Sequence, residues 1–385
     1  MVDEIGRYYE FFAGGGLARL GLGRQWRCVF ANEISEKKAA AYRLNFGTCQ
    51  ELLVDDVRNV KREQLPEPAD LAWASFPCQD LSLAGNGLGF QGERSSTFWP
   101  FWKLIKELGE QGRSVPLVVL ENVVGALTSN GGLDFQAILR ALCQAGYRFG
   151  ALVIDAVRFV PQSRPRLFIV AVHLDTSIPT GLTLDGPGSC WHTKTLLDAH
   201  AALPEDIRES WVWWRLPIPP RLRETLTELV DDMPEGVEWH SSAETARLLS
   251  LMTDTNLDKV RKAQAYGKRI AGTIYKRIRQ DEKGIKKQRA EVRFDQIGGC
   301  LRTPTGGSSR QSVILVQGSS IRTRLLSPRE AARLMGAGDY HLPEKYNDAY
   351  HVMGDGLAVP AVQWLARHLL RPLAVSASAS TALVA

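Results

Sequence analysis

Apolar runs of strand length alternate with helical patterns through the first half of this chain. The runs are rich in β-branched, aromatic and leucine side chains, and they cover residues 7–12, 26–33, 51–57, 70–76, 116–123 and 149–159. Helical patterns follow several of them, for example over 36–46. This alternation predicts an α/β fold with a Rossmann-like, doubly wound and mostly parallel sheet. Ligands of such sheets bind at the carboxyl ends of the strands, so the residues there are candidates for function.

Composition limits the class of protein. A chain of 385 residues with 44% hydrophobic residues has room for one large domain and a second, smaller module. It contains no apolar run of membrane-spanning length, and its N-terminus lacks the basic start and apolar core of a signal peptide. These features predict a cytoplasmic protein without a membrane partner. The six cysteines show neither CxxC spacing nor a Cys/His cluster, which predicts no disulfide framework and no metal site.

The ends of the first three strands point to a nucleoside-bearing cofactor. The glycines at 14–16 let the backbone approach a ligand closely, and the helix that follows offers free N–H groups. Glu33 ends the second strand, where a carboxylate can accept hydrogen bonds from ribose hydroxyls. Asp56, after the third strand, is a candidate partner for an adenine amino group or, equally, a helix N-cap. Leu17 and Arg19 stand where a dinucleotide GxGxxG turn would continue, so its third glycine is missing.

A cysteine stands at the end of the strand over 70–76. Cys78 follows Pro77, whose locked φ fixes the local backbone, and a thiolate there would be a capable nucleophile. The alternative is a small buried apolar side chain, the usual role of a free cysteine. The loop over 82–96 is rich in glycine and serine, which predicts a polar flap able to close over a substrate.

Positive charge gathers in one segment. Residues 258–293 hold 13 Lys or Arg and 4 Asp or Glu, a local net charge of +9 in a chain of +5 overall. Such a segment favours contact with the phosphates of a polyanion, the alternative being a solvated basic helix or arm. Its apolar residues recur at roughly helical spacing, which predicts a helix packed partly on the protein body. The tryptophan-rich stretch 211–220 is expected to be local core.

Seven segments, in this order, resemble the motifs of DNA (cytosine-5)-methyltransferases of the bacterial type. They are FFAGGG, ANEIS, SFPCQDLS, LENV, VPQSRPRLFIV, RLLSPREAARLMG and GDGLAVPAVQWLA, within residues 5–172 and 322–372. The resemblance implies a class I methyltransferase with a discontinuous catalytic domain over 1–173 and 322–375. A target-recognition domain would span 174–321, and 376–385 would be a frayed tail.

The resemblance also implies a mechanism. The Cys78 thiolate would attack carbon 6 of cytosine, so that carbon 5 can take the methyl group of S-adenosylmethionine and leave S-adenosylhomocysteine. Glu121 would protonate or hydrogen-bond ring atom N3, and Asn122 would hold that carboxylate and the strand end. Arg164 would hydrogen-bond the carbonyl O2 of the base, while Arg166 would brace the site or a phosphate.

The cofactor contacts follow from the same motifs, and the DNA contacts from the loop after Cys78, the basic segment and the Gly-Ser loop within residues 300–316. The implied cofactor-binding residues are Phe12, Gly14, Gly16, Glu33, Ile34, Asp56, Pro77 and Asp355. The implied DNA-binding residues are Gln79, Ser82, Arg94, Lys276, Arg277, Arg302 and Arg310. Two positions depart from the family pattern: Asp355 replaces the usual Asn and removes a donor, and Glu10 stands where Asp is commoner.

The resemblance implies double-stranded DNA as substrate, with the target base flipped out of the helix while the loop over 82–92 closes from one groove. It further implies a monomer at the nucleoid and a cognate restriction endonuclease as functional partner. Three alternatives stay open. A tRNA methyltransferase of the same fold is disfavoured by the large recognition region, and a catalytically inactive DNA-binding relative by the intact motif residues. A nicotinamide oxidoreductase is disfavoured by the incomplete glycine fingerprint.

Overall fold

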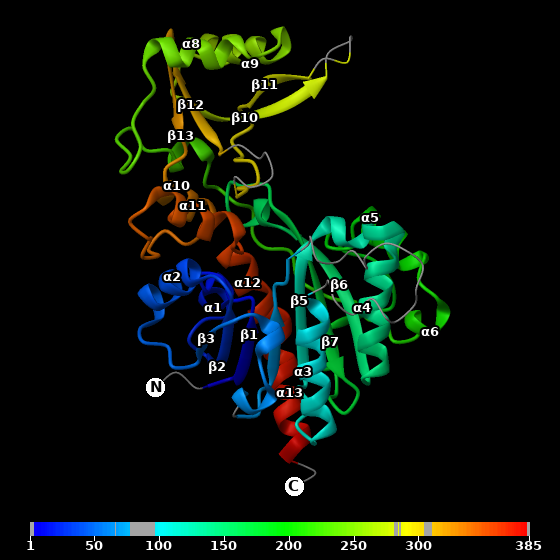
Figure 1. Cartoon of the computed structure of the whole chain (residues 1–385). Helices are drawn as coiled ribbons and strands as arrows, with labels where there is room; N and C mark the ends of the chain where they lie inside the picture. Colours follow the sequence, from blue (N-terminus) through cyan, green and yellow to red (C-terminus); the bar gives the residue numbers. More distant parts are fainter. Residues whose placement is uncertain are drawn as a thin grey trace. The chain divides into compact units, whose positions relative to one another are not determined.

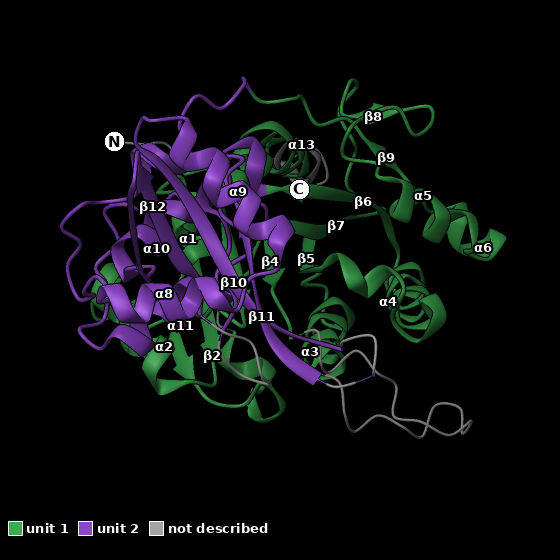
Figure 2. Ribbon diagram, turned by 90° about the horizontal axis from the view of Figure 1, so that it is seen from above, with its two compact units in different colours: residues 1–155, 165–219, 361–385 green, residues 156–164, 220–360 purple. Residues whose placement is uncertain are grey.

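The structure, a computed structural model, describes residues 4–65, 67–77, 97–280, 284, 286–303 and 310–382, without the side chains of 378–382 (Figure 1). The chain divides into two units, coloured separately in Figure 2. Unit 1 consists of residues 1–155, 165–219 and 361–385, and unit 2 of residues 156–164 and 220–360.

A seven-stranded sheet organises unit 1, in the order β3-β2-β1-β4-β5-β7-β6. Only β7 runs antiparallel to its neighbours, β5 and β6, and the other pairs are parallel. The predicted α/β fold with a mostly parallel sheet is confirmed. The strands are β1 (Gly6–Phe11), β2 (Trp26–Glu33), β3 (Leu52–Val54), β4 (Leu71–Ala74), β5 (Leu117–Val123), β6 (Tyr147–Asp155) and β7 (Pro165–His173).

The apolar residues of the strands and helices in unit 1 recur with the period of the element that they belong to. Residues 117–120 of β5 are at most 1% exposed, as expected for a strand covered on both faces. In α3 (Phe98–Glu110) the buried residues recur every three or four positions, from Phe98 through Trp102 to Leu108. The other helices are α1 (Leu17–Leu22), α2 (Glu36–Phe46), α4 (Leu133–Gln144), α5 (Lys194–Ala201), α6 (Glu205–Arg208) and α13 (Arg371–Ala382).

Residues 174–219 pack on the sheet of unit 1, although the predicted recognition domain included them. The strands β8 (Thr183–Leu184) and β9 (Trp213–Trp214) form a short antiparallel pair. Just before β9, the N–H of Val212 donates to the carbonyl of Phe149 in β6 at 2.7 Å. The Trp214 indole is fully buried and donates to the carbonyl of Val170 at 3.1 Å, so part of the tryptophan-rich stretch is core, as expected. A side chain on Gly150 would collide with the backbone oxygen of Val212, 1.9 Å from its Cβ position.

Unit 2 contains a four-stranded antiparallel sheet in the order β11-β10-β12-β13. Its strands are β10 (Ile270–Gln280), β11 (Lys286–Arg293), β12 (Ser312–Gln317) and β13 (Ser320–Leu325). Helices α8 (Ser242–Ser250) and α9 (Asp254–Ala265) cover one face, where Leu248 and Val260 meet Ile274. Unit 2 also holds α7 (Leu226–Leu229), α10 (Pro328–Leu334) and α11 (Tyr346–Asp355), and α12 (Val359–Leu365) runs on into unit 1.

Two sequence expectations differ from this architecture. The basic segment forms strands β10 and β11 rather than a helix beyond α9, because alternate residues such as Ala290 and Val292 are buried between the sheet and α8 and α9. Residues 376–382 continue α13 rather than fraying, since Leu373, Ala374 and Ala377 pack as a buried helical stripe.

The unit boundaries also differ from the predicted domains. Residues 156–164 and 322–360, expected in the catalytic domain, lie in unit 2. The functional division into catalytic and recognition domains therefore stays a prediction.

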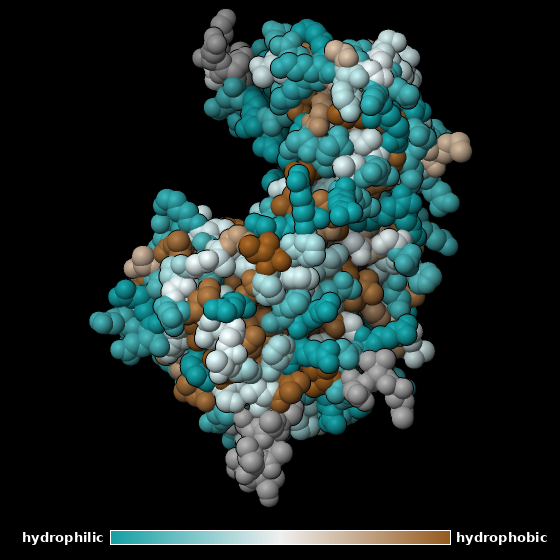
Figure 3. All heavy atoms as spheres, turned by 180° about the vertical axis from the view of Figure 1, so that it is seen from behind, coloured by the Kyte–Doolittle hydropathy of each residue, from teal (hydrophilic) through white to brown (hydrophobic). Residues whose placement is uncertain are grey.

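The surface is typical of a globular protein. On the face shown in Figure 3, hydrophilic residues predominate and hydrophobic residues form separate patches. Among the described residues, no helix combines the length and apolar character that crossing a bilayer requires.

Candidate active site

The turn after β1 uses glycine for two different reasons. Gly14 and Gly16 both have positive φ, 57° and 77°. A Cβ on Gly16 would lie 2.4 Å from the Phe46 ring and 2.8 Å from the Tyr42 ring, so packing against α2 excludes a side chain. A Cβ on Gly14 would meet no described atom within 4 Å. The turn therefore leaves open space beside Gly14, through which a ligand can approach the backbone.

Glu33 joins this turn to the end of β2. One carboxylate oxygen accepts from the backbone N–H of Gly14 and the other from that of Ser35, both at 2.8 Å. Glu33 is 5% exposed, whereas the neighbouring Ile34 is 66% exposed. Each carboxylate oxygen keeps a second lone pair, which can accept from a ribose hydroxyl. Together with the open space at Gly14, this arrangement fits a nucleoside.

Two other predicted cofactor residues, Phe12 and Asp56, contact other residues of the protein. Phe12, half-buried at the start of the turn, also has a positive φ of 58° and packs edge-on to Phe76. Asp56 caps the 3-10 turn η1 (Val57–Asn59): it accepts from the backbone N–H of Arg58 at 2.9 Å and from that guanidinium. These hydrogen bonds from Arg58 hold the pKa of Asp56 below its usual range. The N-cap interpretation of Asp56 therefore has direct support, and its adenine contact stays a prediction.

The end of β5 brings together three of the predicted catalytic residues. Glu121 is 7% exposed, and one of its oxygens lies 3.3 Å from Nε of Arg166 on β7. The register places Arg166 opposite Val123, at the carboxyl end of β5. The Asn122 amide donates to the carbonyl of Phe76 at 3.0 Å, and its oxygen accepts from the backbone N–H of Val123 at 2.8 Å. Asn122 thereby ties the end of β5 to the chain that leads into Pro77.

Comparison with known proteins decides the family. The family model for C-5 cytosine-specific DNA methylases matches residues 6–371 of this chain. The chain belongs to this family. The Type II methyltransferase M.HhaI of Haemophilus parahaemolyticus is 24% identical over 368 residues, which cover 94% of this chain and 94% of that one. M.HpaII of Haemophilus parainfluenzae is 27% identical over 374 residues, covering 95% and 89%.

The solved structures agree in fold. A DNMT2 mutant from Spodoptera frugiperda aligns with a TM-score of 0.58 at 14% identity, over 94% of this chain and 98% of that one. The predicted enzyme class, a DNA (cytosine-5)-methyltransferase, is confirmed by the family match and the similarity to Type II methyltransferases.

The two motif arginines have different surroundings in this methyltransferase. Arg164 is 1% exposed, and its guanidinium donates to the carbonyls of Leu301, Gly354 and Gly356 at 2.9, 2.8 and 2.7 Å. In the structure Arg164 is buried among backbone acceptors of unit 2, and its contact with the base stays a prediction. The arginine beside Glu121 is Arg166, because β7 begins at Pro165 and carries Arg166 to the end of β5.

Three further predicted residues, Arg302, Arg310 and Asp355, lie in unit 2, and the backbone of Arg302 passes next to Gly354, the residue before Asp355. The Asp355 carboxylate, at the end of α11, accepts from the Thr303 hydroxyl. Arg310 donates to the side-chain oxygen of Asn347 and lies over the Tyr346 ring. Arg302 is exposed. The contact of Asp355 with the cofactor, and the contacts of both arginines with DNA, stay predictions.

Several predictions fall outside the described residues. Pro77 is described, and is exposed, but Cys78, Gln79, Ser82 and Arg94 are not. The same holds for the whole predicted flap over 82–96 and for residues 304–309.

Gln162 is a residue that the sequence interpretation missed, although it belongs to the quoted VPQSRPRLFIV motif. It is fully buried, its amide nitrogen donates to the carbonyl of Leu334 at 2.7 Å, and its oxygen accepts from the N–H of Leu301 at 3.1 Å. Gln162 therefore fixes the backbone from which Arg164 takes one of its acceptors. Its position in the motif, two residues before Arg164, was the sequence signal that could have identified it.

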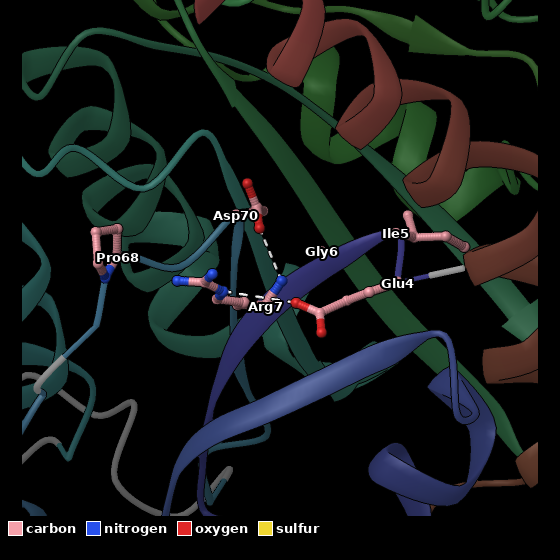
Figure 4. Close-up of a pocket in the computed structure, with 6 residues that line it drawn as sticks. All are labelled: Glu4, Ile5, Gly6, Arg7, Pro68 and Asp70. Carbon is pink, nitrogen blue, oxygen red and sulfur yellow. Dashed lines mark hydrogen bonds and ion pairs between the residues drawn. The ribbon is translucent and has the colours of Figure 1, made fainter. Parts of the chain in front are cut away.

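A pocket at the amino end of β1 is not part of this site (Figure 4). The Arg7 backbone N–H donates there to Asp70 at 2.7 Å. The pocket lies at the start of the strands, whereas ligands of doubly wound sheets bind at their carboxyl ends. Its lining residues are Glu4, Ile5, Gly6, Arg7, Pro68 and Asp70.

Proposed function

We propose that this methyltransferase transfers a methyl group from S-adenosylmethionine to carbon 5 of cytosine in a specific duplex DNA sequence. The base is flipped out of the helix and held in a covalent adduct with Cys78. The observation that carries the proposal is the Glu121–Arg166 pair, 3.3 Å apart, beside the Asn122 bond to Phe76. Phe76 lies two residues before Cys78, so this bond anchors the chain that bears the nucleophile.

The residues at the strand ends support the cofactor. Glu33 would take the ribose hydroxyls, Ile34 would cover a face of the adenine, and the backbone at Gly14 would line the methionine part. The bound cofactor supplies an electrophilic methyl group on its sulfonium.

The residues of this chain then perform the remaining chemistry. Carbon 5 of cytosine is a poor nucleophile until a thiolate adds to carbon 6, and Cys78 makes that bond. Glu121 protonates or hydrogen-bonds N3, which removes electron density from the ring as the thiolate attacks. Arg166 orients the Glu121 carboxylate, and its guanidinium is the group available to the carbonyl O2. After methyl transfer, a base such as solvent water takes the proton from carbon 5, the electrons of that bond restore the C5–C6 double bond, and the bond between carbon 6 and the Cys78 sulfur breaks to release the thiolate.

The test is base-resolution sequencing of 5-methylcytosine on a random duplex library, after treatment with purified protein and S-adenosylmethionine. Cys78→Ala is assayed in parallel, with Cys190→Ala, an exposed cysteine of unit 1, as the matched control. We expect methylation within one short sequence for the wild type and the control, and none for Cys78→Ala, which still binds DNA. Full turnover by Cys78→Ala would exclude it as the nucleophile. If the wild type does not methylate duplex DNA, the proposal is wrong. RNA substrates would then be tested, and after them the hypothesis of a catalytically inactive relative.

We further propose a cognate restriction endonuclease as functional partner, and action as a monomer at the nucleoid. The support is that the similar proteins are Type II methyltransferases. The expected outcome is that DNA methylated by the protein resists one endonuclease of the same specificity. Measurement of the molecular mass in solution checks the oligomeric state, and the mass of one chain is expected.

A further inference from the structure

Strands β10 and β11 form a two-stranded ribbon that leaves the sheet of unit 2 (Figure 1). β10 pairs with β12 only over residues 270–274, whereas its ladder with β11 continues to Gln280 opposite Lys286. Apart from a bridge between Ala290 and Met252, residues 275–280 and 286–291 therefore pair with each other and not with β12. A two-stranded ribbon of this kind fits the major groove of duplex DNA.

The register divides the ribbon into two faces, one rich in cations and one on which Ile278, Gln280 and Gln288 lie between Lys276 and Lys286. On one face Arg277 lies opposite Arg289, and Arg279 lies opposite Lys287. Glu291 on that face accepts from Arg279 at 2.6 and 2.8 Å. This cation-rich face has long side chains that can reach the phosphates flanking a groove.

The second face continues the buried face of the sheet beyond its helical cover. Further in, Ile274 and Val292 are buried against α8 and α9, and the cover ends at Ala290, whose N–H donates to the carbonyl of Leu251 at 3.0 Å. Beyond Ala290, the register sets Ile278 opposite Gln288. Ile278 is 66% exposed and Gln288 is also exposed.

An aliphatic side chain and an amide, side by side and exposed on a basic ribbon, match the major-groove edge of an A·T pair. A glutamine amide can bond N7 and N6 of adenine in a bidentate way, and an apolar side chain contacts the thymine methyl group. We propose that Ile278 and Gln288 read an A·T base pair in the recognition sequence, while the cationic face contacts phosphates. This proposal rests on duplex DNA as the substrate, as proposed above.

The first test compares the sequence preference of Ile278→Ala and Gln288→Ala with that of the wild type on the random duplex library. Gln288→Ala is expected to relax the preference at one A·T position by roughly 5- to 150-fold, the discrimination of one bidentate base contact, and Ile278→Ala to relax it at the same position by a smaller factor. Ile218→Ala, which removes an equally exposed isoleucine (61%) from unit 1, is the control and should keep the wild-type preference. Ile278→Val and Gln288→Glu repeat the test with less structural change, and cofactor binding checks that each variant is folded.

The second test changes the DNA instead of the protein. Uracil in place of thymine removes the methyl group, and 7-deazaadenine in place of adenine removes N7. The wild type should lose rate on both duplexes, whereas Ile278→Ala should be insensitive to uracil and Gln288→Ala to 7-deazaadenine.

The outcomes separate this proposal from the one on which it rests. A uniform loss of rate with unchanged sequence preference would make the ribbon a phosphate contact only and would overturn the proposal. So would wild-type preference in both variants. Failure of the wild type itself to methylate duplex DNA would refute the proposed function, and this reading of the ribbon with it.

Discussion

Glu10 carries a carboxyl group into the core beneath the glycine turn. It is 1% exposed and accepts from the Tyr42 hydroxyl at 3.2 Å, and that hydroxyl accepts in turn from Arg19 at 2.9 Å. Arg19 pairs with Glu51 at 2.6 Å, so the network joins β1, α1 and α2 to the start of β3. Burial raises the pKa of Glu10 from 4.5 to about 7.

This shifted group should make stability depend on pH. Between pH 4.5 and about 7 the folded protein holds a proton on Glu10 that the unfolded chain has released, so stability falls as pH rises through this window and then levels off. Glu10→Gln should remove this slope, worth about 3 kcal/mol at most. Urea unfolding at pH 5 and pH 8 measures it, and Glu10→Asp, which keeps a carboxyl group, is the control. Equal slopes in the wild type and Glu10→Gln would contradict the assignment.

Glu121 and Arg164 should respond differently to substitution. Glu121→Gln keeps the shape of the side chain but removes the acid, so the methylation rate should fall by roughly 10²- to 10⁴-fold with DNA affinity retained. Arg164→Met leaves the carbonyls of Leu301, Gly354 and Gly356 without a donor and should instead lower the free energy of unfolding by roughly 3 kcal/mol. Single-turnover kinetics and urea unfolding distinguish the two effects. A stable Arg164→Met protein with reduced catalysis would instead support a contact of Arg164 with the target base.

At the scale of elements, the β10–β11 ribbon concentrates charge on an edge strand. β11 is at the edge of its sheet, and cationic side chains on an edge also prevent pairing with another chain. Contact with phosphates and protection of the edge therefore predict different consequences of charge removal.

Removing charge from the ribbon should weaken DNA binding and flatten its salt dependence. Lys287→Gln with Arg289→Gln should lower the slope of log affinity against log salt by about 0.9 for each lost phosphate contact. Binding titrations at several salt concentrations measure the slope, and Lys194→Gln on α5 is the matched control. An unchanged slope accompanied by self-association would favour the edge-protecting role.

At the scale of the whole molecule, the C-terminal helix closes unit 1. Leu373, Ala374 and Ala377 are buried, the Ser376 hydroxyl lies 2.8 Å from that of Ser177, and Arg371 donates to Gln25 at 3.4 Å. These contacts connect the last part of the chain to segments from the start and the middle of unit 1.

Truncation before Arg371 should therefore destabilise unit 1. Loss of the buried Leu373 alone is worth roughly 1.5–3 kcal/mol, so the melting temperature and cofactor binding should both fall. Deletion of only the last three residues is the control and should change neither. A truncated protein with wild-type melting would contradict a stabilising role of α13.

The sequence by itself determined the local elements and the chemical inventory of the site. Glycine spacing, the position of Glu33 at a strand end and the apolar runs depend on neighbours along the chain, so they could be interpreted without coordinates. The motif order likewise indicated the family and the residues Glu121, Asn122, Arg164 and Arg166. β7 was not predicted as a strand from its pattern, although its motif was recognised.

Only the tertiary structure decided which side chains meet. Two arginines separated by one residue are equivalent in the sequence, but the register of β7 against β5 brings Arg166 to Glu121, while distant backbone carbonyls enclose Arg164. The basic segment likewise matches a helical period, and burial against α8 and α9 makes it a ribbon instead. The reason is the same in both cases: these outcomes depend on contacts between residues far apart in the chain, which a local pattern does not specify.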